Sequence, residues 1–479
     1  MKDYDVIVIG GGLLGCFTAR NICRRKLRVA LLETREDVCT GISRANTAIV
    51  YPGYDHKPGT LKAEMAVRAN AHFDALCREL DVPFSRCGSL MVSFGEKADV
   101  VLRKKVENGL LLGVPGLRLL SGEEARKVEP ALAEGVSSAL YAPTAGTINP
   151  WELGIAACEN AAANGAKLFL NTRVMGIHRT AEGYRIESNR EHFCCRAVVN
   201  CAGLNADRVQ ELLFPASVHI APDAADYLIL DKAAENMPTH IIQYEPEDGG
   251  KGFNAVPTVE GSLLLGPSER EIEEDYAVNA LGLSFVRERA ARVLPGLDLG
   301  EAIRSFAAVR PNPQRSDGSS IGSFVIEHPG PGFWSLIGIK TPGLTCADEL
   351  GRTVAEEVAA FLDADVNEAF NGRRNGIKRM HSMSREQRNA AILANPDCGE
   401  VICCCEDVTR AEVLDAIRRG AVSVDGVKRR TGTGMGRCQG SRCQQKLIAL
   451  LAQEMGVSEA AVCKDGADSE LLGGGRHEN

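Results

Sequence analysis

The sequence predicts an α/β protein with a small, mainly helical domain at its C-terminal end. Its 479 residues suffice for two to four domains, and 44% hydrophobic and 25% charged residues are typical of globular proteins. A short β-branched run near the N-terminus leads directly into a glycine-rich turn, which is how a parallel βαβ unit begins. Towards the other end, four cysteines stand in two closely spaced pairs before an amphipathic helical pattern.

Charge and hydropathy exclude several classes of protein. A net charge of −8 argues against a general nucleic-acid binder, which needs a strongly basic surface. Apolar stretches stay well short of the roughly 20 residues that span a bilayer, and the acidic N-terminus does not match a signal peptide. We therefore expect a cytoplasmic protein without a transmembrane segment, peripheral to a membrane only through a partner. In that compartment its 17 cysteines should be free thiols or metal ligands.

The first motif indicates a dinucleotide site. Residues 5–9 read as a buried strand, residues 10–15 satisfy G-x-G-x-x-G, and a helix to Cys23 and a strand over residues 28–32 follow. Glu33 ends the second strand, where a carboxylate accepts hydrogen bonds from ribose hydroxyls and repels the 2′-phosphate of NADP. The motif alone is compatible with both FAD and NAD.

Later motifs distinguish these cofactors by resemblance. They occur in order at residues 43–51, 200–204, 310–311, 317–322 and 338–345. This ordered set resembles the D-amino-acid-oxidase-like superfamily of FAD enzymes. Within it, the chain is most similar to the A subunit of anaerobic glycerol-3-phosphate dehydrogenase and to L-2-hydroxyglutarate oxidases, particularly in residues 52–62, 141–146 and 263–267.

The resemblance implies a discontinuous, Rossmann-like FAD domain and a substrate domain built on an antiparallel sheet. The expected segments are 1–85, 147–225 and 310–365 for the FAD domain, 86–146 and 226–309 for the substrate domain, 366–397 for a basic linker, 398–456 for a helical iron–sulfur domain and 457–479 for a tail. Residues 90–94 and 227–230 are strand candidates in the substrate domain. Residues 472–479 are expected to be disordered.

The resemblance also assigns residues to FAD. Ser43, Asn46 and Thr47 match a loop at the diphosphate and flavin, and Val174 matches the position that reads the adenine. Thr345 should open a helix to residue 361, whose positive end would stabilise reduced flavin. The complete expected set is Gly10, Gly11, Gly12, Leu14, Gly15, Glu33, Thr34, Ser43, Asn46, Thr47, Val174, Ala202, Gly203, Gly338, Gly343, Leu344 and Thr345.

Three further residues are candidates for the substrate side. Arg310 matches the family arginine that clamps a carboxylate or phosphate, and Lys340 would assist it. Tyr51 stands where relatives commonly carry a histidine, which excludes covalent flavin attachment at that position. A phenol, with a reference pKa of about 10, is a poor base, so the general base stays open. Residues 223–226 lack the Arg-rich, glycine-containing turn of relatives, which indicates a changed substrate.

The C-terminal cysteines resemble a bacterioferritin-associated-ferredoxin type of [2Fe–2S] domain. Cys403, Cys405, Cys438 and Cys443 have the spacing C-x-C and C-x₄-C, with Cys404 expected to be a non-ligand. The alternative is a structural zinc site, which usually uses C-x₂₋₄-C pairs.

The sequence around these cysteines makes local predictions. Thr409 and Glu412 form a capping box at the start of a helix to residue 420, and residues 444–455 form a final amphipathic helix. Lys428, Arg429, Arg430 and Arg437 are expected to offset the negative charge of the cluster.

Together these observations predict a dehydrogenase that oxidises a small anionic substrate, glycerol 3-phosphate or a 2-hydroxy acid, by hydride transfer to FAD. The cluster would then pass single electrons to a partner protein. One alternative is an amino- or imino-acid dehydrogenase on the same scaffold. Another alternative is a non-catalytic electron-transfer subunit whose substrate site has decayed. Tyr51 and residues 223–226, which depart from the family pattern, are compatible with this alternative.

Overall fold

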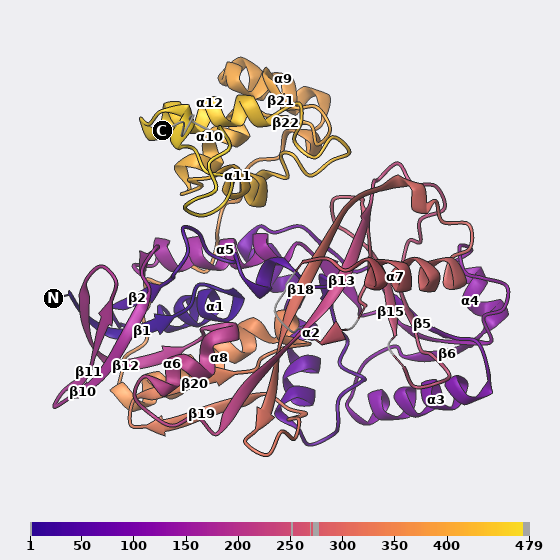
Figure 1. Ribbon diagram of the computed structural model, residues 1–479, viewed down its shortest axis with the longest axis horizontal. Helices are drawn as coiled ribbons and strands as arrows, with labels where there is room; N and C mark the ends of the chain where they lie inside the picture. The colour runs from indigo at the N-terminus through magenta and orange to yellow at the C-terminus, as the bar shows by residue number, and fades with distance from the viewer. Residues whose placement is uncertain (1, 251, 269, 272–276, 473–479) are drawn as a thin grey trace, which may run out of the picture.

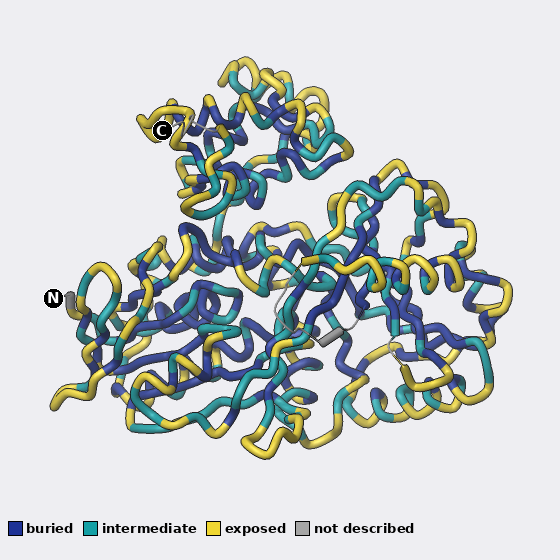
Figure 2. Tube along the Cα trace, viewed as in Figure 1, coloured by how far each residue is buried: buried dark blue, intermediate teal, exposed yellow. Residues whose placement is uncertain are grey.

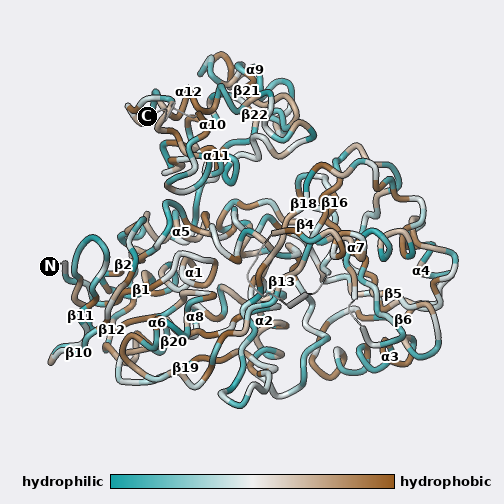
Figure 3. The backbone as a smooth tube through the Cα atoms, in the orientation of Figure 1, coloured by the Kyte–Doolittle hydropathy of each residue, from teal (hydrophilic) through white to brown (hydrophobic). Residues whose placement is uncertain are grey.

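The computed structural model describes residues 2–250, 252–268, 270–271 and 277–472. Within these residues, two large sheets lie side by side and a separate, mainly helical domain sits above them (Figure 1). Buried residues concentrate on the strands of both sheets (Figure 2). The outlying helix α9 (Arg385–Ala394) has no buried residue, and its first turns are hydrophilic (Figure 3).

Eight of the described strands form the sheet nearer the N-terminus, in the order β10-β11-β12-β1-β2-β9, with β20 joined to β12 and β19 to β20. Its strands are β1 (Lys2–Ile9), β2 (Val29–Leu32), β9 (Lys167–Phe169), β10 (Val174–Thr180), β11 (Gly183–Ser188), β12 (His192–Asn200), β19 (Val325–Gly330) and β20 (Phe333–Ile337). β1 is buried between parallel neighbours β12 and β2 because its alternating valines and isoleucines pack on both faces. The helices that accompany this sheet are α1 (Leu13–Ile22), α2 (Leu61–Leu80), α5 (Pro150–Ala163), α6 (Ala206–Glu211) and α8 (Gly343–Leu362).

The second large sheet contains nine described strands and is antiparallel except between β14 and β5. Its order is β17-β13-β16-β15-β14-β5-β7-β6, with β18 on the other side of β13. The strands are β5 (Ser89–Ser93), β6 (Arg118–Ser121), β7 (Ser138–Ala142), β13 (Val218–Leu230), β14 (Ile241–Tyr244), β15 (Phe253–Pro257), β16 (Leu263–Gly266), β17 (Arg270–Glu271) and β18 (Ala302–Arg315); the helices are α3 (Glu96–Leu111), α4 (Gly122–Val128) and α7 (Ala280–Val293).

The remaining elements are short. A small antiparallel sheet joins β3 (Ile49–Val50), β8 (Gly146–Ile148) and β4 (Phe84–Ser85) between the two large sheets. The C-terminal domain contains α9, β21 (Val401–Cys403), β22 (Val408–Thr409), α10 (Arg410–Arg418), α11 (Val424–Thr431) and α12 (Gln444–Met455). The 3₁₀ helices are η1 (Ile42–Arg44), η2 (Gly203–Asn205), η3 (Leu299–Glu301), η4 (Met380–Ser382), η5 (Pro396–Gly399) and η6 (Glu459–Ala461).

Local predictions from the sequence agree with these elements. The capping box of Thr409 and Glu412 starts α10, and α12 has the predicted bounds.

The domain boundaries that we expected at 225/226 and 309/310 fall inside strands β13 and β18. These two strands pair from Val218 to Leu230, and Val218 packs with Ile337 of the first sheet, so each strand runs from one sheet region into the other.

The prediction that residues 457–479 form a tail is wrong for its described part. Val462 is buried in the core of the C-terminal domain, and the Val424 amide donates to the Cys463 carbonyl at 3.1 Å. Residues 473–479, most of the segment expected to be disordered, lie outside the described residues. Part of the predicted linker lies along α5, where Arg374 Nε donates to Glu159 at 2.6 Å. Among the described residues, no helix is long and apolar enough to cross a membrane.

Arg20 joins four of the helices that accompany the first sheet, in the interior of that part of the protein. Its side chain is 0% exposed; Nε donates to Asn160 of α5 at 3.0 Å, and Nη2 pairs with Glu79 of α2 at 3.0 Å. Nη1 lies 3.5 Å from Asp348 of α8. One buried cation therefore ties α1 to α2, α5 and α8.

Replacing Arg20 should destabilise this helical layer. We expect Arg20→Met to lower the free energy of unfolding by about 3 kcal/mol, because it leaves the carboxylate partners of a buried ion pair uncompensated. Arg28→Met, which removes an exposed pair with Asp5, should cost less than about 1 kcal/mol. Urea denaturation measures both changes, and equal shifts of the first unfolding transition would contradict this role for Arg20.

Candidate functional site

A cavity of about 840 Å³ lies between the two large sheets. Ile9, Leu32 and Cys201, at the carboxyl ends of β1, β2 and β12, line one side, and residues of β14 and β15 line the other. The carboxyl edge of a parallel sheet is where ligands bind in this class of fold. The volume of the cavity lies in the usual range for small-molecule and cofactor sites.

The glycine turn allows α1 to point into this cavity. Gly10 has φ +102°, and a Cβ on Gly15 would lie 1.8 Å from the Gly10 carbonyl oxygen, so neither position accepts another residue without movement. Gly12 is the N-cap of α1 and gives it no side-chain cap, and the first turn of α1 contains no acidic residue. The positive end of the helix is therefore available to a diphosphate.

Glu33 lines the cavity and also holds the turn. Its Oε2 accepts from the Gly11 amide at 2.6 Å, and its Oε1 accepts from the Arg35 amide at 2.8 Å. Burial raises the pKa of Glu33 above its ordinary value. The acid expected to bind ribose thus stands at the cavity wall with its position fixed by two backbone donors.

Most residues expected to bind FAD line this cavity, namely Gly10, Gly12, Leu14, Glu33, Thr34, Ser43, Asn46, Thr47, Val174, Ala202, Gly203, Gly343 and Leu344. Gly11, Gly15, Gly338 and Thr345 support the wall from behind. A Cβ on Gly338 would lie 2.4 Å from the Cβ of Pro313, and Thr345 Oγ1 accepts from the Tyr51 amide at 3.0 Å.

Helix α8 begins at Gly343, two residues before the predicted start. Its N-cap, Pro342, has no side-chain cap, and its first turn contains no acidic residue. Since Gly343 and Leu344 line the cavity, a second positive helix end opens onto it. Two helix N-termini, a glycine turn and an acid at the end of β2 surround one cavity, and this combination fits FAD.

Arg310 lies at the cavity wall and is already paired. It stands on β18 directly opposite Asp223 of β13, and its Nε and Nη2 donate to the two Asp223 oxygens at 2.7 Å each. The residues 223–226 that lack the family's arginines therefore supply a carboxylate to the predicted anchor. The sequence did not reveal this pair because it depends on strand register.

Tyr51 also lines the cavity, with its hydroxyl 3.4 Å from Thr47 Oγ1. Burial raises the pKa of Tyr51, and burial likewise raises the pKa of its cavity neighbour Tyr227. Both phenols are therefore protonated at neutral pH and can donate hydrogen bonds. A general base at Tyr51 is incompatible with this environment.

Lys340 is another of the cations that line the cavity. Its Nζ donates to Asn312 Oδ1 at 2.5 Å. Burial, with a smaller effect from the charge of Lys340, lowers the pKa of nearby Lys62 to about 8. Lys62 was not predicted, since a single lysine at a helix start carries no motif.

The far wall of the cavity is polar and was also missed. Tyr54 O–H donates to Gln243 Oε1 at 2.8 Å, and Gln243 Nε2 donates to Asn254 Oδ1 at 3.3 Å across the β14–β15 pair. Gln243 and Asn254 line the cavity. Only the pairing of these strands brings their side chains together.

The four predicted cysteine ligands come together as two pairs. Cys403 and Cys443 interact with one another, and this interaction lowers the pKa of Cys403 below its ordinary value. Cys405 is likewise hydrogen-bonded to Cys438. Among the described residues, no three potential ligands converge on one point. Two sulfur pairs suit two irons better than the single tetrahedral ion of a structural zinc site.

The surroundings of these cysteines correct one prediction. Arg429 and Arg430 do not offset cluster charge, because Asp37 of the first domain binds both of them. Arg437 pairs with Glu301 of the second sheet region. For Lys428 the prediction stands: burial lowers its pKa to about 8, and the charge of Cys443 acts against this shift. Backbone amides of Gly440 and Arg442 donate to Cys438 instead, as the glycines in this loop permit.

Cys404 is exposed, whereas Cys403 is buried. We expect Cys404→Ser to retain the iron content of the unchanged protein, because its side chain points to solvent. Cys403→Ser should lose most of the bound iron, since one of four ligands is removed. Iron analysis and the visible spectrum of anaerobically purified protein measure both, and loss of iron from Cys404→Ser would contradict the ligand set.

Known proteins resemble the chain over nearly its whole length. A glycerol 3-phosphate dehydrogenase from Caloramator mitchellensis is 39% identical over 98% of both chains. The anaerobic glycerol-3-phosphate dehydrogenase subunit A1 of Haloferax volcanii is 26% identical over 99% of this chain and 87% of its own. The FAD-bound L-α-glycerophosphate oxidase structure from Mycoplasma pneumoniae covers 78% of this chain and 99% of its own, with a TM-score of 0.72 and 24% identity, and so supports the fold.

Two family descriptions match separate parts of the chain. That of the FAD dependent oxidoreductases matches residues 5–357, which include the cavity between the sheets. That of the BFD-like [2Fe-2S] binding domain matches residues 401–453, which include all four paired cysteines. The predicted resemblance and both cofactors are confirmed: the chain belongs to the FAD dependent oxidoreductase family and carries a BFD-like [2Fe-2S] binding domain at its C-terminal end.

Proposed function

We propose that the protein is a dehydrogenase that oxidises glycerol 3-phosphate, or a closely related small anionic alcohol, and delivers electrons through its cluster to a partner protein. The observation that carries this proposal is the pair of cations, Arg310 and Lys340, at the wall of the FAD cavity. The 39% identical relative is named a glycerol 3-phosphate dehydrogenase, which supports the choice of the first substrate to test.

Arg310 would orient the anionic end of the substrate. Asp223 fixes the guanidinium through two 2.7 Å hydrogen bonds, so little side-chain freedom is lost on binding. Lys340 adds a second positive group beside this pair, at the same cavity wall. Both features favour a small anion placed between these two side chains.

Tyr51 and Tyr227 would act as hydrogen-bond donors. Their raised pKa values keep both hydroxyls protonated, so they can hold a substrate oxygen but not remove its proton at neutral pH. When bound, FAD supplies hydride acceptance and the [2Fe–2S] cluster supplies one-electron transfer. Single-electron transfer suits a protein acceptor, which is the reason to propose a partner.

One observation favours a second candidate, an amino- or imino-acid dehydrogenase. The Asp223 carboxylate beside Arg310 would pair with a substrate ammonium group. This candidate differs from the first in the charge of the substrate, and a substrate screen separates the two.

Anaerobic bleaching of the flavin absorbance tests the proposal. We expect glycerol 3-phosphate to bleach the holoenzyme, with 2-hydroxyglutarate and proline much less effective. Arg310→Ala should raise the substrate concentration for half-bleaching about 100-fold or more, because truncating one partner of a buried charge pair costs about 2–5 kcal/mol. Arg315→Ala, an exposed arginine on the same strand, is the matched control and should react normally.

Three outcomes would contradict the proposal. Bleaching by amines alone would favour the amino-acid dehydrogenase. A normal response of Arg310→Ala would remove the proposed anchor. No bleaching by any anionic alcohol or amine would favour the non-catalytic electron-transfer subunit.

A further inference from the structure

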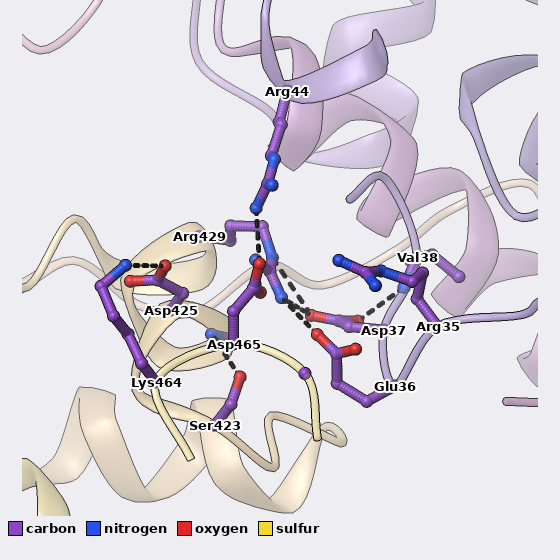
Figure 4. Close-up of polar contacts among 12 residues, drawn as sticks. Arg35, Glu36, Asp37, Val38, Arg44, Ser423, Asp425, Arg429, Lys464 and Asp465 are labelled. Carbon is purple, nitrogen blue, oxygen red and sulfur yellow. Dashed lines mark hydrogen bonds and ion pairs between the residues drawn. The ribbon is translucent and has the colours of Figure 1, made fainter. Parts of the chain in front are cut away.

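One loop of the FAD domain faces both the FAD cavity and the C-terminal domain. After β2, Glu33, Thr34 and Arg35, and then residues 40–43 and 45–47, line the FAD cavity. Glu36, Asp37 and Arg44 of the same loop face the C-terminal domain instead (Figure 4). Cofactor and iron–sulfur domain therefore contact opposite sides of a single segment.

Asp37 is the centre of the contact with the C-terminal domain. Both of its oxygens accept from Arg430, at 2.7 and 2.8 Å, and Oδ2 also accepts from Arg429 Nη2 at 3.0 Å. The side chains of Asp37, Arg429 and Arg430 are only 3%, 5% and 6% exposed. Although burial opposes ionisation, these hydrogen bonds lower the pKa of Asp37, so the contact is fully charged at neutral pH.

Asp465 closes the contact into a ring. It accepts from Arg429 Nη1 at 2.9 Å and from Arg44 Nη1 at 2.8 Å, so the charges run Asp37, Arg429, Asp465, Arg44 (Figure 4). The ring starts and ends on the same cavity-lining loop. Ser469 holds the far corner, because its hydroxyl accepts from the Asp465 amide at 3.0 Å.

The loop is attached equally firmly to the glycine turn. The Cys39 amide donates to the Gly11 carbonyl at 2.8 Å, and the Leu13 amide donates to Ser43 Oγ at 2.9 Å. The Gly11 amide in turn donates to Glu33. A shift of the loop would therefore move donors and acceptors of the FAD cradle.

Contacts between the C-terminal domain and the second sheet region are more exposed. Lys232 Nζ donates to the Cys405 carbonyl at 3.0 Å with its side chain 46% exposed, and Arg437, which pairs with Glu301, is 62% exposed. Exposed pairs contribute little, whereas breaking a buried pair is costly. The buried part of the ring, Asp37 with Arg429 and Arg430, is thus the stronger of these two connections.

We infer that Asp37 and Asp465 are positioning residues that couple the two redox sites: docking of the iron–sulfur domain orders the loop that binds FAD, and FAD in turn strengthens docking. Coupling of this kind is reciprocal, because a ligand that favours the docked state is itself bound more tightly by that state. The cluster domain is then part of the FAD site, although none of its residues lines the described cavity.

The test starts from full-length, cluster-containing protein from which FAD has been removed. FAD is then titrated back, and its binding is measured by the quenching of flavin fluorescence. We expect Asp37→Asn to raise the Kd for FAD about tenfold or more, and Asp465→Asn about fivefold, within the usual range of coupling. Glu123→Gln removes an exposed ion pair with Lys127 and should leave the Kd unchanged. Iron content and thermal unfolding check that each variant is folded.

Asp465→Asn keeps the test decisive if Asp37→Asn fails to fold, because Asp465 is 17% exposed and does not line the cavity. Trypsin cleavage at exposed Arg373 and Lys378, in the segment leading to the C-terminal domain, gives the reciprocal measurement. FAD should slow this cleavage severalfold in the unchanged protein and less in Asp465→Asn. A Kd for Asp465→Asn within twofold of the unchanged protein, or cleavage that FAD does not slow, would overturn the inference.

Discussion

The close approach of residue 15 to the Gly10 carbonyl is the constraint on which the arrangement depends. Because the two positions carry no side chains, α1 packs against the end of β1 and its N-terminus reaches the cavity. Glu33 then fixes the turn from the neighbouring strand, and Ser43 fixes the first amide of the helix. The position of the FAD cradle thus follows from contacts between a few backbone groups, and the loop that supplies them continues to the iron–sulfur domain.

That loop gives a physical reason for carrying both centres on one chain. A flavin handles two electrons and a [2Fe–2S] cluster handles one, so the transfer between them needs a defined geometry. Here Asp37 and Asp465 form a ring of charges with Arg429 and Arg44 that connects the cavity-lining loop to the cluster domain, and the Asp37–Arg429 pair within it is buried. The substrate side is built differently, from two long strands whose register sets Arg310 opposite Asp223.

Features that depend on neighbouring residues were predictable from the sequence. The glycine turn, Glu33, the capping box of Thr409 and Glu412 and the final helix all depend on short-range patterns, and the structure contains them. Interactions across long separations were not. Arg430 stands close to the cluster cysteines in sequence, which suggested a role in cluster charge, but its partner Asp37 is 393 residues away. Residues 223–226 were noted only for lacking the Arg-rich, glycine-containing turn of relatives, whereas pairing of β13 with β18 makes Asp223 the partner of Arg310.

Substrate oxidation at the flavin should reduce a cluster held on the same chain. The most direct measurement is the low-temperature electron paramagnetic resonance spectrum of the holoenzyme after anaerobic addition of glycerol 3-phosphate, with the flavin absorbance recorded on the same sample. We expect loss of flavin absorbance together with the signal of a reduced [2Fe–2S] cluster. A bleached flavin beside a cluster that stays oxidised, or a protein without iron, would contradict it.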